Sequence, residues 1–452
     1  MREKCPSTIP SFTKYFKLPI LRLLGRKFYK YYKDLKKSQY YSLEKLRKMQ
    51  FKKLKKLLDI AYNYVDFYRE LYDRQNIRPS EVNSLDDLVK LPIVSKKDLK
   101  KAYPNHSINR NIKKSKILIN STSGSTGKPF VFALNWYKKD RIEALKIRNF
   151  EYTGYGYGRK FYSLWGFTPS ENLISKLYKK FILKRTLLES INLTDETKEK
   201  YSHILMNNPN TYLEGYASGL VILAKYMKSK GYKANLCGVT SSAESLIPLH
   251  RKYLKEVYSD NVFNRYGTRE FGDISIECQK HTGLHINMES FIVEIVDEEG
   301  EICPPGEKGS IVVTDLDNYV MPFIRYTLED ISSILDRKCS CGRHSILMSD
   351  PEGRIVDTIV TPEGKHLSFG FFVLMFEDFP IVDQFQIAQI DESNLELKIV
   401  KNLSFSEEKF QPLLNQVVDY CSSMKVNVNY VDKIPLERSG KMRIVKGLSD
   451  FD

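Results

Sequence analysis

Apolar residues recur every three or four positions between residues 43 and 72, which is the spacing of one face of a helix. Farther along, residues 116–120 and 130–134 are short apolar runs with the length and β-branched content of strands. The pattern therefore predicts a helical N-terminal region that leads into strands. The helical stripe consists of Leu46, Met49, Leu54, Leu57, Leu58, Ala61 and Tyr62.

Between residues 137 and 263 short apolar runs alternate with helical patterns. Strands are predicted over 211–216, over 236–241 and from Val262 onward, and a helix is predicted after each of the first two. Strands that alternate with helices are typical of a parallel sheet covered by helices. From Leu284 the strands instead alternate with turns, which predicts an antiparallel part. The pattern as a whole indicates an α/β fold.

Length and composition indicate a large, folded chain. With 452 residues, two or three domains are expected, and the 42% hydrophobic and 12% aromatic residues suffice for a large core. No apolar run reaches the roughly 18 residues of a membrane-spanning helix. The N-terminus has no apolar signal core, and the odd number of seven cysteines favours reduced thiols, so a cytoplasmic location is expected.

The chain is strongly basic, with 71 Lys and Arg against 55 Asp and Glu and a formal charge of +16. Such a charge favours anionic partners. No nucleic-acid-binding motif accompanies it, so nucleotides, coenzyme phosphates and anionic lipid are preferred over nucleic acid. Residues 14–37 hold nine basic residues and one acid, mixed with aromatics. They fit either peripheral contact with the inner face of a membrane or a packed helix with a solvated lysine face.

A Ser/Thr/Gly loop joins the two strands predicted over 116–120 and 130–134. Such a loop presents backbone N–H groups that attract phosphate, and Lys128 adds a compact positive charge. The pattern GxxxxGK[ST] is absent, but Thr122–Pro129 resembles the phosphate loop of adenylate-forming enzymes, the acyl-CoA synthetase superfamily. The resemblance implies that nucleotide phosphates are bound by Ser123, Gly124, Ser125, Thr126, Gly127 and Lys128.

The run Tyr266–Phe271 resembles the Tyr-Gly-x-x-Glu element of the same superfamily. The resemblance implies that an aromatic ring lies beside the adenine and that Glu270 serves the magnesium ion bound to ATP. Arg269 departs from the pattern, because many relatives carry Thr or Ser there. The segment Ser242–Glu244 resembles the one that runs along the adenine. The nucleotide-binding residues implied by these two segments are Ala243, Glu244, Tyr266, Gly267 and Thr268.

Three further segments resemble family elements in the expected order. The run 321–330 ends in Asp330, whose carboxylate would accept hydrogen bonds from the ribose hydroxyls. In the run 353–357, Arg354 would approach the ribose and phosphates, and Asp357 would be the hinge. The loop around Lys441 resembles the one with the catalytic lysine, which would neutralise charge on the α-phosphate.

The resemblance implies an adenylate-forming enzyme fold of the phenylacetate–CoA ligase-like branch, which includes capsule-synthesis-associated proteins. A large N-terminal α/β adenylation domain of several subdomains would cover residues 1–355, with a basic helical segment at 1–75. A small, mobile C-terminal α+β domain would cover 356–452, with strands near Phe385, Leu395 and Val426 and a helix at 406–421. The active site would lie between the two domains.

The implied reaction uses ATP, Mg²⁺ and CoA. A small carboxylic acid would attack ATP to give an acyl-adenylate, and a thiol, most simply that of CoA, would then take the acyl group. Two alternatives stay open. One is transfer of an amino or hydroxy acid to a surface-polysaccharide precursor, and the other is a nucleotide-binding protein without catalysis.

Cysteine and histidine residues stand in two groups after the proposed nucleotide-binding segments. Cys278 and His281 follow the first, and Cys339 and Cys341 follow the second. Thiolates and an imidazole at such spacings can form a tetrahedral zinc site. The sequence thus predicts a structural zinc held by Cys278, His281, Cys339 and Cys341, with His285 as the competing fourth ligand and unliganded cysteines as the alternative.

Overall fold

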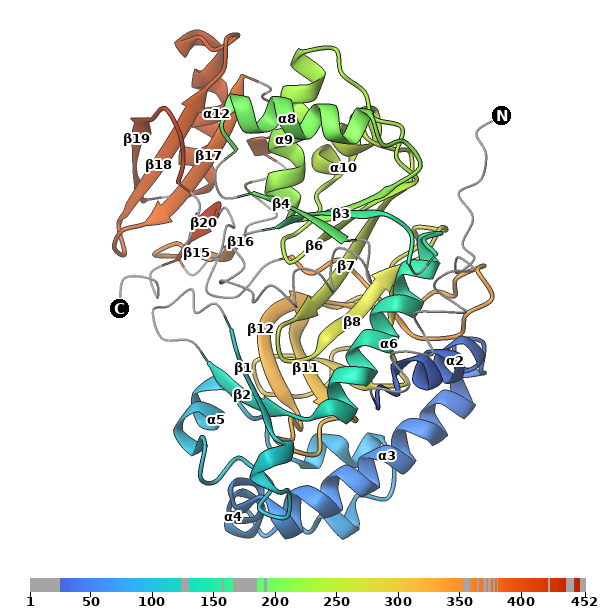
Figure 1. Cartoon of the computed structure of the whole chain (residues 1–452). Coiled ribbons are helices and arrows are strands. Elements are labelled where there is room, and N and C mark those ends of the chain that lie inside the picture. The colour runs from blue at the N-terminus through green and yellow to red at the C-terminus, as the bar shows by residue number, and fades with distance from the viewer. Residues whose placement is uncertain are drawn as a thin grey trace.

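A computed structural model describes residues 25–122, 130–156, 158–165, 185–190, 193–352, 358–363, 366–368, 372, 375, 376, 379, 381–421, 423–435 and 443–447. The N-terminal helices lie at one end of the molecule, and the C-terminal strands lie at the other end, beside α8 to α10 (Figure 1). The mixed α/β architecture agrees with the predicted fold class.

The N-terminal helices are α2 (Phe28–Ser38), α3 (Leu43–Tyr64) and α4 (Asp66–Arg74). Ser42 caps α3, because its side chain accepts a hydrogen bond from the Lys45 backbone N–H. The predicted apolar stripe faces the core, since Leu54 and Leu57 are fully buried. The run predicted over 43–72 is divided into two helices at Val65, whose backbone is extended.

Helix α2 packs on the main body through its aromatic face. Phe28, Tyr32 and Leu35 are buried, and Tyr32 donates a hydrogen bond to Glu151 at the end of α6 (Trp136–Tyr152). The lysines on the other face of α2 are exposed. Within residues 25–38, the structure therefore agrees with the packed-helix interpretation. Among the described helices, none combines the length and hydrophobicity that crossing a bilayer requires.

Short elements connect the N-terminal helices to the first strands: η2 (Pro79–Glu81), η3 (Asp86–Lys90), α5 (Lys96–Ala102) and η4 (Lys114–Lys116). Strands β1 (Leu118–Ser121) and β2 (Val131–Leu134) then pair antiparallel, with Ser121 opposite Val131. This pairing confirms the two strands that the sequence predicts on either side of the Ser/Thr/Gly loop.

A nine-stranded sheet forms the centre of the large body. The strands from β7 to β4 in its spatial order are parallel, and the others are antiparallel. This part confirms the predicted alternation of strands and helices. In spatial order the strands are β13 (Ile334–Leu335), β14 (Leu347–Met348), β9 (Leu284–Ile286), β8 (Gly272–Glu277), β7 (Val262–Thr268), β6 (Gly238–Ser242), β5 (Tyr212–Gly215), β3 (Phe161–Trp165) and β4 (Arg185–Glu189).

Helices α8 (Asp195–Met206), α9 (Ala217–Ser229) and α10 (Pro248–Val257) lie near the parallel strands (Figure 1). Helix α6 packs along β8, and buried ion pairs fix it there. Lys138 Nζ lies 2.6 Å from Asp315 Oδ2, and Arg148 Nη1 lies 3.1 Å from Glu289 Oε1. Separating the partners of a buried ion pair would leave an uncompensated charge in the core. These pairs therefore fix the position of α6.

The antiparallel part predicted beyond Leu284 is present. Strands β10 (Phe291–Val296), β11 (Gly309–Asp315) and β12 (Tyr326–Ser332) form a three-stranded antiparallel sheet with β11 in the middle. Strand β12 carries Asp330 toward the carboxyl end of β7, as the site geometry below shows.

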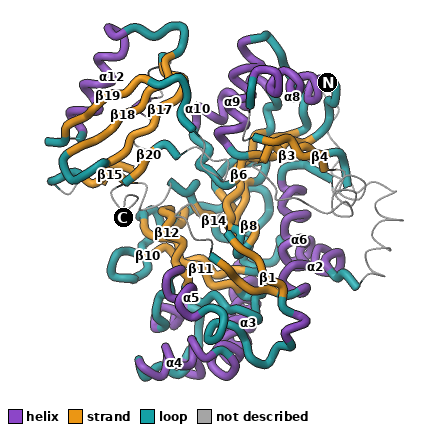
Figure 2. The backbone as a smooth tube through the Cα atoms, turned by 60° about the vertical axis from the view of Figure 1, so that its left-hand side comes forward, coloured by secondary structure: helices purple, strands orange, loops and turns teal. Residues whose placement is uncertain are grey.

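The C-terminal residues form a separate α+β unit. Its four-stranded sheet has the order β19 (Lys425–Tyr430), β18 (Asn394–Lys401), β17 (Val382–Gln389) and β20 (Val445–Lys446), with helix α12 (Glu407–Tyr420) beside it. Strands β15 (Thr358–Val360) and β16 (His366–Ser368) form a further pair. The strands and the helix predicted here are present (Figure 2).

This unit has its own hydrophobic core, in which Ile387, Leu397 and Leu413 are fully buried. The core is built mainly from residues between 359 and 445, which is what an independent domain requires. The boundary predicted between residues 355 and 356 falls outside the described residues and stays a prediction.

Candidate active site and cysteine–histidine cluster

The carboxyl ends of β5, β6 and β7 meet at one edge of the nine-stranded sheet, because these neighbouring strands run parallel. Ala243 and Glu244 follow β6 directly, and Thr268 ends β7. Ligands of open α/β sheets bind outside the carboxyl ends of the strands. The predicted adenine-binding segments thus share the edge at which a nucleotide would be expected.

Tyr266 and Asp330 are in direct contact, although 64 positions separate them in the sequence. The Tyr266 hydroxyl donates a hydrogen bond of 2.6 Å to Asp330 Oδ2, and both residues are half-buried. Strand β7 supplies the tyrosine and β12 supplies the aspartate. The structure therefore brings the residue predicted beside the adenine together with the residue predicted at the ribose.

The Glu244 side chain binds the first turn of α9. Its Oε2 accepts a hydrogen bond of 2.7 Å from the Ser218 backbone N–H, and its Oε1 accepts one of 3.0 Å from the Ser218 hydroxyl. A carboxylate at a helix N-terminus is favoured by the unpaired N–H groups and the helix dipole. Ala243 has a left-handed backbone with φ of 67°. The Glu244 side chain is thus held by the first turn of α9.

The turn between β7 and β8 holds a buried carboxylate and a buried hydroxyl. Glu270 is 5% exposed. Thr268 Oγ1 is buried and has no hydrogen-bond partner among the described residues. A buried polar atom without a partner is costly, so such an atom at a candidate site is consistent with a ligand that completes it.

Arg269 connects this turn to the first strand pair. Its Nε donates a hydrogen bond of 3.1 Å to the backbone carbonyl of Ser121, the last residue of β1. At the adjacent position, the Thr122 N–H donates to the Phe130 carbonyl at 2.9 Å, and the Phe130 N–H donates to Thr122 Oγ1 at 3.1 Å. The base of the predicted phosphate loop therefore lies next to Arg269.

Several predicted site residues cannot be placed by the structure. The predicted phosphate-binding residues 123–128 lie outside the described residues. Arg354, Asp357 and Lys441 also lie outside them. Their predicted roles therefore rest on the sequence.

A stacked aromatic pair at the same edge includes one residue, Tyr216, that the sequence did not single out. Trp165 at the end of β3 and Tyr216 after β5 stack with ring centroids 4.4 Å apart and an interplanar angle of 23°. Burial raises the pKa of Tyr216 to about 12, with the Glu244 charge as a second cause, so its hydroxyl is neutral. The available sequence signal was an aromatic residue directly after a parallel strand. Ser218 was missed as well, because its contact with Glu244 joins the first turn of α9 to the loop after β6, 26 positions away in the sequence.

A second cluster lies beyond the other end of β8. Cys278, His285, Cys339 and Cys341 each offer one ligand atom, and these atoms all lie within 4.8 Å of one another. The Cys278 and Cys339 sulfurs are 3.5 Å apart, and Cys341 Sγ is 3.4 Å from His285 Nε2. The residue directly after β8, one position on β9 and one loop thus bring the three thiols and one imidazole together.

His285 is oriented so that Nε2 faces the thiols. Its other nitrogen, Nδ1, lies 2.9 Å from Ser345 Oγ, and the ring meets Tyr152 edge-on. Burial lowers the pKa of His285 to about 4, with Arg343 and Arg148 as further causes, so the imidazole is neutral at pH 7. Burial also raises the pKa of Cys278 to about 12, so this thiol stays protonated unless a cation binds.

His281, the first choice for the fourth ligand, lies outside the cluster. Its ring stacks on Phe263 at a centroid distance of 5.1 Å, and its Nδ1 is 3.5 Å from Glu277 Oε2. The pairing of β9 with β8 places His285 opposite Ile276, two residues before Cys278. The strand register therefore favours the alternative histidine over the one nearer in sequence.

Comparison with known proteins finds one matching family model and several related proteins. Residues 359–447 match the family model described as the CapK C-terminal domain. Phenylacetate-coenzyme A ligase of Thermus thermophilus is 26% identical over 388 residues, which cover 83% of this chain and 86% of that protein. Protein CapK of Staphylococcus aureus is 24% identical over 284 residues, which cover 60% of each protein.

Solved structures share the fold at lower identity. A crystal structure of 2-hydroxyisobutyryl-CoA ligase in the postadenylation state has a TM-score of 0.75 at 17% identity and covers 92% of both chains. ATP-bound MatB from Rhodopseudomonas palustris has a TM-score of 0.52 at 14% identity and covers 72% of this chain and 66% of that chain. These similarities confirm the fold and the resemblance on which the sequence prediction depends.

Proposed function

We propose that this chain, which has the adenylate-forming enzyme fold and resembles phenylacetate–CoA ligases and CapK, activates a carboxylic acid with ATP and passes the acyl group to a thiol. The observation that carries the proposal is the 2.6 Å contact between Tyr266 and Asp330 at the carboxyl edge of the parallel strands. Relatives named phenylacetate-coenzyme A ligase support CoA as the first candidate acceptor.

Asp330 would bind the ribose hydroxyls. A carboxylate has lone pairs for about four hydrogen bonds, so the bond from Tyr266 does not exhaust it. That bond also limits the rotation of both side chains, which would keep the aromatic ring next to the base. Glu244 and α9 would hold the backbone of Ala243 against the edge of the adenine.

Glu270 and Thr268 are the described residues suited to a magnesium ion. Magnesium prefers oxygen ligands and is held in nucleotide sites by one or two protein groups together with substrate phosphates. The buried Glu270 carboxylate and the unpartnered Thr268 hydroxyl fit this chemistry. When bound, the ion would neutralise charge on the phosphate oxygens.

The reaction would have two steps. In the first, a carboxylate oxygen of the substrate bonds to the α-phosphorus of ATP, and the bond from that phosphorus to pyrophosphate breaks. Lys441, together with residues 123–128, would stabilise the charge that develops on the phosphate oxygens. In the second step the thiol sulfur bonds to the acyl carbon, AMP leaves, and the thiol proton passes to solvent. Positioning and electrostatics do the catalysis, without a covalent intermediate on the protein.

The two steps would use two positions of the C-terminal domain, with Asp357 as the hinge and Arg354 beside the nucleotide. The separate core within residues 359–445 supports a unit that moves as one body. Domain closure of this kind sets the rate of many enzymes. The proposed boundary remains between residues 355 and 356.

The cysteine–histidine cluster would hold a structural zinc ion through Cys278, His285, Cys339 and Cys341. Four protein ligands with no open position are typical of structural rather than catalytic zinc. The contact of Ser345 with His285 Nδ1 is the kind of outer partner that orients a ligating imidazole. The ion would join the loop after β8 to the loop before β14.

A second candidate function follows from the CapK similarity. The C-terminal domain matches the CapK model, and CapK of Staphylococcus aureus is among the relatives. An acceptor other than CoA, such as a surface-polysaccharide precursor, would then receive an amino or hydroxy acid. Contact of residues 14–37 with anionic lipid would suit such an acceptor. If it occurs, the described part must use lysines, because the aromatic face of α2 is buried.

Pyrophosphate release across a panel of aryl, aliphatic, hydroxy and amino acids tests the proposed function, with and without CoA. We expect release that depends on one class of acid, and AMP formation that CoA accelerates. Turnover that CoA leaves unchanged would favour the second candidate acceptor. Binding of ATP without pyrophosphate release for any acid would instead support a nucleotide-binding protein without catalysis.

A further inference from the structure

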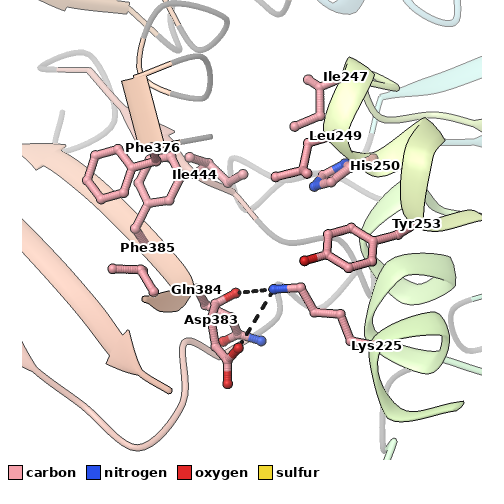
Figure 3. Close-up of a pocket in the computed structure, with 11 residues that line it drawn as sticks. Lys225, Ile247, Leu249, His250, Tyr253, Phe376, Asp383, Gln384, Phe385 and Ile444 are labelled. Carbon is pink, nitrogen blue, oxygen red and sulfur yellow. Dashed lines mark hydrogen bonds and ion pairs between the residues drawn. The ribbon is translucent and has the colours of Figure 1, made fainter. Parts of the chain in front are cut away.

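Helices α9 and α10 of the large body face strand β17 and Ile444 of the C-terminal domain across a small cavity (Figure 3). The cavity has a volume of about 80 Å³. Side chains from both bodies point into this cavity, so it belongs to a contact between the two domains, which we call the domain seam. Its lining includes Lys225, Ile247, His250, Tyr253, Phe385 and Ile444.

Lys225 and Asp383 make the polar part of this contact. Lys225 Nζ donates a hydrogen bond of 3.0 Å to the Asp383 backbone carbonyl and lies 3.8 Å from its carboxylate. Lys225 is on α9 and Asp383 is on β17, so the ion pair joins the two bodies. The side chains are 33% and 51% exposed. Exposed pairs of this kind contribute little free energy.

The apolar part is small as well. Ile247, just before α10, packs against the core of the C-terminal domain. On the other side, Phe376 and Phe385 stack with ring centroids 3.7 Å apart. The cavity between the two sides shows that they do not interdigitate as a domain core does. The contact therefore orients the C-terminal domain without fixing it permanently.

Strand β17 links this contact to the chain segment that contains Lys441. Ile444, three positions after Lys441 in the sequence, accepts a hydrogen bond of 2.8 Å from the Ile387 N–H through its carbonyl. The next residue, Val445, pairs with Ile387 in the parallel β17–β20 ladder. Whatever orients β17 therefore also orients β20, which begins four positions after the predicted catalytic lysine.

Structures of one relative differ in how well they match the described arrangement. The 2-hydroxyisobutyryl-CoA ligase structure in the postadenylation state has a TM-score of 0.75 with 92% of both chains covered. The structure of that enzyme in the thioesterification state has a TM-score of 0.63 with 91% of both chains covered. Because the coverage is nearly equal, the difference lies in the arrangement rather than in the extent of the fold.

We propose that the Lys225–Asp383 contact is a positioning element for the adenylation step, and that it separates for transfer of the acyl group to the acceptor. The inference deepens the proposed function and rests on it. It makes Lys225 and Asp383 positioning residues, because the contact acts on the reaction only through the orientation of β17 and β20.

The test measures each half-reaction in four variants. Lys225→Met removes the ion pair and keeps the aliphatic stem, and Asp383→Lys places two cations together. The double variant Lys225→Asp/Asp383→Lys restores opposite charges. Lys228→Met is the matched control, because Lys228 lies one turn along α9 and pairs with Glu256 of the same body at 2.6 Å.

We expect Lys225→Met to slow acid-dependent ATP–pyrophosphate exchange roughly two- to fivefold, in line with the strength of an exposed ion pair. Asp383→Lys should slow it more, and the double variant should recover part of the loss. Transfer from pre-formed acyl-adenylate to the acceptor should be unchanged or faster. Equal slowing of both half-reactions, or the same loss in Lys228→Met, would overturn the proposal.

Hydrogen–deuterium exchange gives a result that does not depend on activity. Amides of residues 247–253 should exchange faster in Asp383→Lys than in the native chain. Unchanged exchange in Asp383→Lys would refute the contact itself. A native chain that shows this exchange pattern but no pyrophosphate exchange with any acid would refute the proposed function and, with it, the catalytic role assigned to the contact.

Discussion

The two ends of the β7–β8 hairpin carry different chemistry in different surroundings. At one end, Tyr266 and Asp330 are half-buried, and the Thr268 hydroxyl has no partner among the described residues. At the other end, Cys278 and His285 are buried and the ligand atoms of the cluster face one another. Partly exposed polar groups suit a ligand that binds and dissociates in every turnover. A set of three thiols and one imidazole that face one another suits a permanently bound ion.

This comparison leads to separable expectations for the two ends. Changes at the nucleotide end should alter rates and substrate affinity while the fold stays intact. Changes at the thiol end should alter metal content and stability first, and activity only as a consequence.

The largest effect is expected for Lys441→Ala. Loss of a positioned charge at the α-phosphate should slow adenylate formation by about 10²–10³, by analogy with the loss of an oxyanion donor. Transfer from pre-made acyl-adenylate should be largely spared. The exposed Lys433, on the same segment, gives the matched control Lys433→Ala. Equal impairment of both half-reactions would show that the lysine is misassigned.

The thiol end is tested by comparing two histidine variants. Native protein purified without chelator should contain about one zinc per chain, because four protein ligands close the site. His285→Ala should lose the metal and lower the melting temperature, whereas His281→Ala should keep the zinc, because its ring stacks on Phe263 instead. Metal analysis with thermal denaturation measures both. A chain that contains no zinc would rule the site out.

The fourth ligand also shows what sequence reasoning could and could not provide. The run Tyr266–Glu270 is contiguous, so its chemistry could be recognised without coordinates. The choice between His281 and His285 depends on the β8–β9 register, which places His285 opposite Ile276. No spacing rule contains that register, so the sequence left both histidines open.

The fold was predicted best where the hydrophobic pattern was strong. The alternation over 137–263 and the C-terminal α+β unit are present as predicted. Strand β4 and helix α8 were missed, because β4 is mostly polar and exposed and α8 buries only Ser202 and Leu205. The contact of Glu244 with Ser218 was missed because it joins a loop to a helix turn 26 positions away.

At the nucleotide end, Asp330→Asn should raise the apparent KM for ATP about 10- to 100-fold, since it weakens charge-assisted hydrogen bonds to the ribose. Tyr266→Phe removes only the hydroxyl that donates to Asp330, so it should have a smaller effect. Steady-state kinetics at saturating acid measures both variants. An unchanged KM for ATP in Asp330→Asn would contradict the ribose assignment. Neither variant should change the zinc content.

The smallest effect concerns His250 at the domain seam. Burial, together with the nearby Lys225 charge, lowers the pKa of His250 to about 4. Between about pH 6.5, the ordinary value, and pH 4, the unfolded state therefore binds the proton more readily than the folded state. Native protein should lose stability relative to His250→Gln as the pH falls through this window. If the difference in melting temperature between native protein and His250→Gln stays constant from pH 7.5 to 4.5, the lowered pKa of His250 is contradicted.

The central claim is that the substrate carboxylate attacks the α-phosphorus of ATP. A single turnover with ATP labelled at that phosphorus, run without thiol and with the acid selected from the panel, tests it most directly. We predict that the label appears in an acyl-adenylate that CoA or another acceptor converts to labelled AMP. Label recovered as ADP, or retained in ATP in the presence of every acid, would contradict the claim.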